Sequence, residues 1–95
     1  MKISESRVET PNAGRYLAQL CKHFAHKLPV ELDDTVGSIV FTIGICRLEA
    51  QPAALLLRCE SPDATKLDQL QIVITDHVAR FGWREAPDIL WAAAD

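Results

Sequence analysis

The segment Arg15–Lys27, RYLAQLCKHFAHK, constrains the fold most, because as a helix it is apolar on one face and basic on the other. At about 100° per residue, its apolar side chains form one stripe that a neighbouring layer must cover. The helix is expected to begin at Thr10-Pro11, with Thr10 as N-cap and Pro11 at the first helical position. It is expected to end near Leu28, because Pro29 follows. The stripe contains Tyr16, Leu17, Leu20, Cys21, Phe24, Ala25 and Leu28.

The middle of the chain alternates apolar and polar residues, which indicates two β-hairpins. The first, Val30–Thr42, is predicted to turn at Asp33-Asp34-Thr35. The second joins Ile45–Ala50 to Ala53–Glu60 across Gln51-Pro52. Its apolar face and its charged face are typical of an antiparallel sheet with one covered side. The inward side chains are Cys46, Leu48, Ala50, Leu55, Leu57 and Cys59, and the outward ones are Arg47, Glu49, Arg58 and Glu60.

Three further elements complete the expected order. Lys2–Glu9 suits a polar edge strand, and Asp88–Ala93 suits a closing strand with Ile89 and Trp91 on one side. A second helix is predicted to start at Ser61-Pro62-Asp63, with the cap chemistry of the first, and to end at Gly82. Its buried stripe is Ala64, Leu67, Leu70, Ile74, Val78 and Phe81.

These elements predict one α+β domain spanning residues 1–95. The expected architecture is a two-layer sandwich, with two helices packed on one face of a mostly antiparallel sheet, in the order β-α-β-β-β-β-α-β.

Composition argues against several functional classes. The formal charge of −3 argues against general nucleic-acid binding, which needs a basic footprint. Apolar runs such as Ala53–Leu57 are too short to span a bilayer. Lys2 is followed by Ile-Ser-Glu-Ser rather than by an apolar stretch, so no signal peptide is expected. The odd number of cysteines and the lack of CxxC spacing predict free thiols and a cytoplasmic protein.

The outer face of the Arg15–Lys27 helix is the candidate binding surface. Pro11 to Leu28 contains no acidic residue and is +3, which leaves −6 for the rest of a chain of −3. This asymmetry favours an anionic small molecule or an acidic protein surface as partner. The candidate ligand-binding residues are Arg15, Gln19, Lys22, His23 and His26. The competing interpretation is a solvated helix face balanced by acids that fold nearby, namely Glu31, Asp33 and Asp34.

Two further hypotheses concern the same helix. His23 and His26 share a face and could offer imidazoles to zinc, nickel or iron, with His77 as a further candidate, in a metal-dependent enzyme or metal-binding protein. Cys21 lies on the apolar arc, and two ligands on one helix do not make a site. No catalytic residue, metal site or cofactor is therefore assigned from the sequence. The other hypothesis is that the basic face pairs with a second copy, giving a weak homodimer instead of a monomer.

Three motifs together resemble a known family. They are RYLAQLCKHFAHKLPVE (residues 15–31), GICRLEA (44–50) and RFGWRE (80–85). From Val8 to Trp91 the chain resembles the bacterial domain-of-unknown-function family 2218. The resemblance implies a bacterial cytosolic protein. Members also occur fused to siderophore-interacting flavoprotein reductases, so it also implies a loose link to iron handling, and it brings no catalytic residues.

Overall fold

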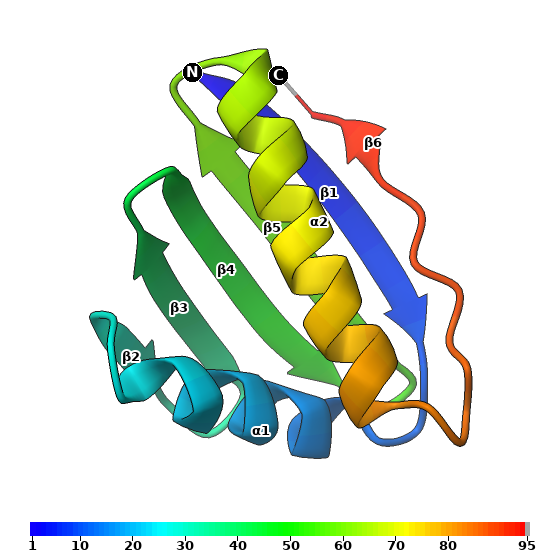
Figure 1. Cartoon of the computed structure of the whole chain (residues 1–95). Coiled ribbons are helices and arrows are strands. Elements are labelled where there is room, and N and C mark those ends of the chain that lie inside the picture. The colour runs from blue at the N-terminus through cyan, green and yellow to red at the C-terminus, as the bar shows by residue number, and fades with distance from the viewer. Residues whose placement is uncertain (95) are drawn as a thin grey trace.

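The strands form one antiparallel sheet, and both helices lie on the same face of it (Figure 1). The structure is a computed structural model that describes residues 1–94. Within those residues the elements are β1 (Lys2–Glu9), α1 (Ala13–Ala25), β2 (Val30–Leu32), β3 (Val36–Phe41), β4 (Gly44–Gln51), β5 (Ala54–Ser61), α2 (Ala64–Phe81) and β6 (Ala92–Ala93). The order across the sheet is β2-β3-β4-β5-β1-β6. The predicted α+β class, element order and one-sided helix packing are confirmed.

The register of the sheet places one apolar row under the helices. In the β4–β5 hairpin Cys46 lies opposite Cys59, and Leu48 lies opposite Leu57, and all four side chains are buried. The alternate residues of these strands, including Arg47 and Arg58, face the other side of the sheet, as the alternation predicts. Because neither helix of residues 1–94 lies on that side, it is the solvated face of the sheet.

The helices bury the expected stripes, with one exception in each. From α1, Tyr16, Leu17, Leu20 and Cys21 are fully buried, whereas Ala25 is exposed because the helix ends there. From α2, Leu70, Ile74 and Val78 are buried, whereas Ala64 is exposed at the first position of the helix. Figure 1 shows α1 crossing one end of the strands and α2 running along them. No helix in residues 1–94 is long and apolar enough to cross a bilayer.

The predicted N-caps were wrong by two residues at both helices. Thr10 is not a cap, because its backbone amide donates to Ala53 of the sheet and its hydroxyl accepts from the amide of Asn12. The N-cap of α1 is Asn12, without a side-chain capping bond. Ser61 is the last residue of β5, and Asp63 caps α2 by accepting from the amide of Lys66 at 2.8 Å. In both places the sheet ladder continues through the residue that sequence chemistry assigns to the cap.

Two strand predictions also need correction. β1 is not an edge strand, because it pairs with β5 along its whole length and with β6 at Ser4 and Glu5. The closing strand is shorter than Asp88–Ala93, since only Ala92 and Ala93 enter the ladder. The preceding residues are anchored by side chains instead. Ile89 and Trp91 pack half-buried against the core, and the indole of Trp91 donates to the hydroxyl of Thr75 at 2.8 Å.

Candidate functional site

The five candidate ligand-binding residues all lie exposed along α1. Arg15, Gln19, Lys22 and His23 belong to the helix itself, and His26 is its C-cap. From Arg15 to His26 the face extends about 16 Å, at about 1.5 Å of rise per residue. This basic face therefore has two ends with different surroundings.

At the Arg15 end the nearest carboxylate is Glu85, which follows α2. Arg15 Nη2 lies 3.9 Å from Glu85 Oε1. Glu85 accepts much shorter hydrogen bonds from Tyr16 Oη at 2.5 Å, Asn12 Nδ2 at 2.7 Å and Thr10 Oγ1 at 2.8 Å. These bonds, led by the one from Tyr16, lower the pKa of Glu85. Because its carboxylate is committed to these donors, it neutralises Arg15 only weakly. The Arg15 side chain stays 58% exposed.

The lysines of this face have no ion-pair partner within residues 1–94. No carboxylate there comes within 4.0 Å of Lys22 or Lys27. By contrast, the arginines of the sheet lie within 3.0 Å of a carboxylate oxygen. Glu31, Asp33 and Asp34, which were expected to balance the helix, form no ion pair with it in the described part of the chain. The basic face is therefore only partly neutralised by the protein's own acids.

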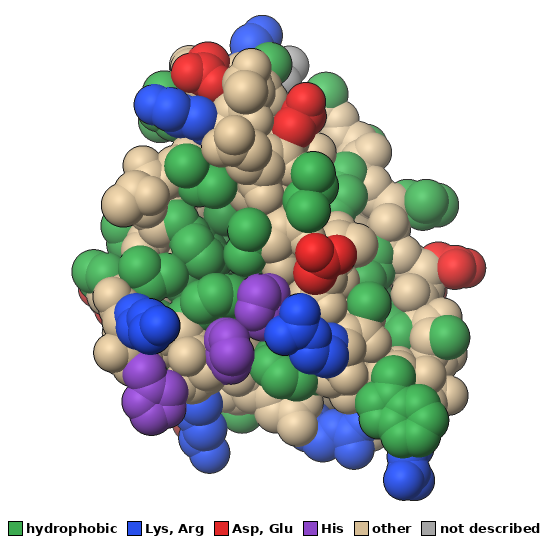
Figure 2. Space-filling model, in the orientation of Figure 1, with side chains coloured by type: hydrophobic (Ala, Val, Ile, Leu, Met, Phe, Trp, Pro, Cys, Tyr) green, Lys and Arg blue, Asp and Glu red, His purple; other side chains and the backbone are tan. Residues whose placement is uncertain are grey.

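At the other end of the face, His23 contacts α2. Its ring centroid lies 4.8 Å from that of His77 and 5.8 Å from that of Phe81. His77 Nδ1 is 2.7 Å from the carbonyl oxygen of Val73, and because a carbonyl only accepts, Nδ1 carries the proton. Burial of the His23 ring, followed by the neighbouring charges of His77 and Arg80, lowers the pKa of His23. In Figure 2 the histidines lie on this face of the molecule near Lys and Arg side chains, with one of them standing apart from the other two.

For the metal hypothesis, residues 1–94 place two imidazoles at this point and no third ligand. Residues 1–94 contain no group of three His, Cys, Asp or Glu side chains placed to hold a metal ion. The imidazole that His23 contacts comes from His77, on the other helix. Cys21, Cys46 and Cys59 are free and buried in the core. A hydrogen bond with Cys59, together with burial, raises the pKa of Cys46.

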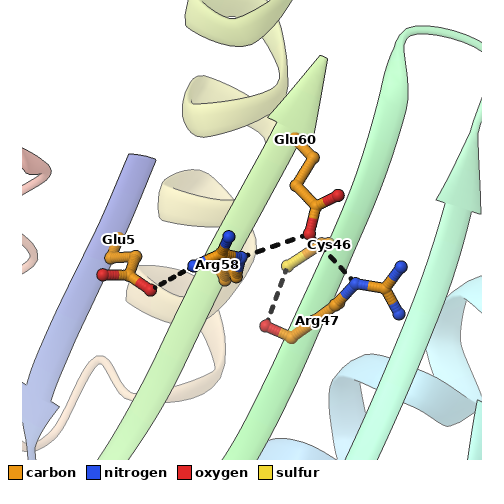
Figure 3. A network of polar contacts seen from close by, with 5 residues as sticks. All are labelled: Glu5, Cys46, Arg47, Arg58 and Glu60. Carbon is orange, nitrogen blue, oxygen red and sulfur yellow. Dashed lines mark hydrogen bonds and ion pairs between the residues drawn. The ribbon is translucent and has the colours of Figure 1, made fainter. Parts of the chain in front are cut away.

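The open face of the sheet carries a second candidate surface. A hollow of about 470 Å³ lies there, over Leu56 and between the side chains of three arginines. Figure 3 shows two of them in a chain of ion pairs: Arg58 binds Glu5 at 2.8 Å and Glu60 at 3.2 Å, and Glu60 also binds Arg47 at 3.0 Å. The third, Arg7, pairs with Glu9 at 2.7 Å. Since each arginine already has a carboxylate, this face offers far less free charge than α1.

Comparison with known proteins identifies the family. The model of a family described as uncharacterized proteins conserved in bacteria, DUF2218, matches residues 5–92. The chain belongs to DUF2218. The resemblance drawn from the three sequence motifs is therefore confirmed. No curated protein matches this DUF2218 chain.

A solved structure supports the fold of this DUF2218 protein. The NMR structure of PA4090 from Pseudomonas aeruginosa is 40% identical to it, and the similarity covers 97% of this chain and 96% of the other. The two structures superpose with a TM-score of 0.83. The overall fold is thus shared with an experimentally determined relative.

Sequence reasoning missed two residues of the DUF2218 site. Arg80 lies three positions after His77 on α2, so both point from one side of that helix, and this spacing was a signal that could have been read. Glu85 had no such signal, because its partners Thr10, Asn12 and Tyr16 are about seventy residues away in sequence.

Proposed function

We propose that this DUF2218 protein is a non-catalytic binding module whose basic α1 face recognises an anionic group on a small molecule or on an acidic protein. The main support is that Lys22 and Lys27 are exposed and lack an ion-pair partner in residues 1–94, in a chain whose net charge is −3. A cationic surface on an acidic protein attracts anions selectively, because the rest of the molecule repels them.

The geometry of the face sets the kind of contact it makes. Arg15 is the main anchor, because its exposed guanidinium has donors left after its long contact with Glu85 and grips a carboxylate in bidentate fashion. Lys22 adds a point charge two helical turns away. The contacts are exposed and therefore screened by salt, so we expect binding to weaken as ionic strength rises.

The test uses two charge-matched double variants and poly-glutamate as the anionic probe. Chemical shifts of the isotope-labelled protein are followed by NMR during titration. Arg15→Ala with Lys22→Ala should abolish the shifts of α1 and leave unfolding nearly unchanged. Lys66→Ala with Arg84→Ala removes the same charge elsewhere on the exposed surface and should leave binding intact. Equal binding by both variants would contradict the role of the α1 face.

The link to iron handling belongs to this proposal through the family resemblance. A siderophore that carries free carboxylates would suit a basic face. Growth of a deletion strain with and without available iron tests this point separately. A defect confined to iron-poor medium supports siderophore handling, and equal growth in both media argues against it.

A further inference from the structure

The C-terminal halves of α1 and α2 meet at a cluster of basic side chains, which we call the histidine junction and define as His23, His77 and Arg80. The two imidazole rings lie 4.8 Å apart, and Arg80 follows His77 by three positions on α2. Within residues 1–94, Arg80 has no carboxylate within 4.0 Å. Basic residues in a last helical turn stabilise the helix dipole one at a time. That effect does not explain why the basic residues of two helices converge.

An apolar floor adjoins the junction. The Phe24 ring lies 4.7 Å from the ring of His77 and 5.0 Å from that of Phe41. Phe24, Phe41 and Ile43 pack against the core but are only half-buried. Neither helix covers the turn between β3 and β4, and apolar side chains continue from the histidines across the sheet there (Figures 1 and 2). Charge and exposed apolar surface thus stand side by side.

We infer that the histidine junction and this apolar floor bind a small carboxylate on an apolar body, such as a medium-chain fatty acid. The carboxylate lies against Arg80 and the imidazoles, and the hydrocarbon chain lies over Phe24 and Phe41. This inference rests on the proposed function, because His23 belongs to the α1 face. It adds that the small-molecule ligand is amphiphilic and that residues of α2 take part.

Charge complementarity favours a singly charged head group. A single guanidinium matches a single carboxylate in bidentate geometry. The lowered pKa of His23 leaves that imidazole neutral at about pH 7, so the permanent charges near it are Arg80 and Lys27. A neutral apolar molecule leaves these cations unpaired, whereas a compact polyanion leaves the apolar floor in water.

Proton uptake should accompany binding. His23 faces His77 and Arg80 from α2, and His26 and Lys27 from the segment directly after α1, and all of them oppose its protonation. A bound carboxylate offsets that repulsion and so raises the pKa of His23. By linkage, the carboxylate binds more tightly as pH falls from about 8 to about 6.

The experiment titrates the isotope-labelled protein with octanoate, acetate and 1-octanol, with octanoate kept below its micelle concentration. Octanoate should shift the ring signals of His23, His77, Phe24 and Phe41, and should raise the midpoint of the His23 titration. Acetate lacks the apolar body and 1-octanol lacks the charge, so each should bind about tenfold more weakly or worse. Equal shifts with 1-octanol would show that the carboxylate is not needed for binding. Equal shifts with acetate would show that the apolar floor takes no part in it.

Two variants of α2 complete the test. Arg80→Gln should weaken octanoate binding about tenfold, since a charge-assisted hydrogen bond is lost. Lys66→Gln removes the same charge from the exposed start of α2 and should have no effect. If poly-glutamate binds but octanoate leaves the ring signals of His23 and His77 unchanged, this inference is overturned and the proposed function stands. Octanoate binding that survives Arg15→Ala with Lys22→Ala, where poly-glutamate never binds, supports the junction and overturns the wider α1 surface.

Discussion

Tyr16 Oη donates a hydrogen bond of 2.5 Å to Glu85 Oε1, and this bond joins the buried face of α1 to the segment that follows α2. Tyr16 is fully buried, whereas the Glu85 side chain keeps about a quarter of its surface in water, 26%. Each residue shifts the pKa of the other. Burial, then the hydrogen bond with Glu85, raises the pKa of Tyr16, and the hydrogen bond from Tyr16 is the largest cause lowering the pKa of Glu85.

Tyr16→Phe should therefore destabilise the fold while leaving the core packing intact. Loss of a hydrogen bond to a charged group costs about 1–2 kcal/mol, which corresponds to a fall in Tm of about 5–10 °C for a domain of this size. Calorimetry measures the change. The control is Tyr16→Phe combined with Glu85→Gln, which should lose little more than Glu85→Gln alone, because that substitution already removes the charge that Tyr16 binds. Strictly additive losses would mean that the pair is not coupled.

The stability supplied by Glu85 should depend on pH. Its folded-state pKa is lowered from the ordinary value of 4.5, so its contribution is complete above that value and is lost as pH falls through the folded-state pKa. Urea denaturation of the wild type and of Glu85→Gln, from neutral to acid pH, measures the difference between them. We expect the difference to be largest at neutral pH and to close below 4.5. A difference that persists at the acid end would assign the effect to packing.

Two glycines should respond in opposite ways to the same substitution. A Cβ at Gly14 meets no atom within 4 Å, so Gly14→Ala should stabilise α1 by about 0.5 kcal/mol. Gly44 has φ +154°, and a Cβ there would collide with the carbonyl oxygen of Glu60 and with Ser61 Oγ. Gly44→Ala should therefore cost about 2 kcal/mol or more. Chemical denaturation of both variants tests the pair, and equal effects would contradict this account of the β3–β4 turn.

The three cysteines should be inert in the folded protein. All are buried, burial raises the pKa of Cys21, and the hydrogen bond with Cys59 leads the causes that raise the pKa of Cys46. Because the thiolate is the reactive form, a thiol reagent such as DTNB should label the native protein at the rate at which it opens. The urea-unfolded protein is the control, and all three of its thiols should react with DTNB at once. Rapid labelling of native thiols would reveal an access route to the core.

The titration of His23 should report its neighbours on α2. Its NMR midpoint is expected below 6.5, because burial and the charges of His77 and Arg80 oppose protonation. Arg80→Gln should raise the midpoint, and Lys66→Gln should not. Since the folded-state pKa is lowered, the contribution of His23 to stability is lost as pH falls. An unchanged midpoint in Arg80→Gln would place Arg80 too far away to act on His23.

Local sequence patterns predicted the elements of this fold well, because those patterns depend on neighbours along the chain. The alternation through Cys46 and Leu48 predicted which face of β4 is covered, and the apolar stripe through Leu17 and Leu20 predicted the buried face of α1. The helix starts were misplaced because Thr10 and Ser61 have cap chemistry that the longer-range ladder overrides. Local preference loses where the sheet offers the same backbone a partner.

The contacts of the candidate site depend on tertiary structure more than the secondary-structure elements do. The helical period placed Arg15, Lys22 and His23 on one exposed face, and the structure has them there. It could not show that His77 would meet His23 from 54 positions away, or that Glu85, not Glu31, would be the acid nearest Arg15. Such pairings follow from how the two helices cross the sheet, and no local period encodes that crossing.

The strand order has a consequence for how the protein behaves at high concentration. The outermost strands, β2 and β6, have three and two residues, whereas β1 has eight. A short edge strand offers few unpaired backbone groups to another chain, so edge-to-edge association into fibrils is disfavoured. Detachment of β6 would expose the unpaired backbone groups of the longer strand β1. The β6 pairing is therefore the point at which polymerisation would begin.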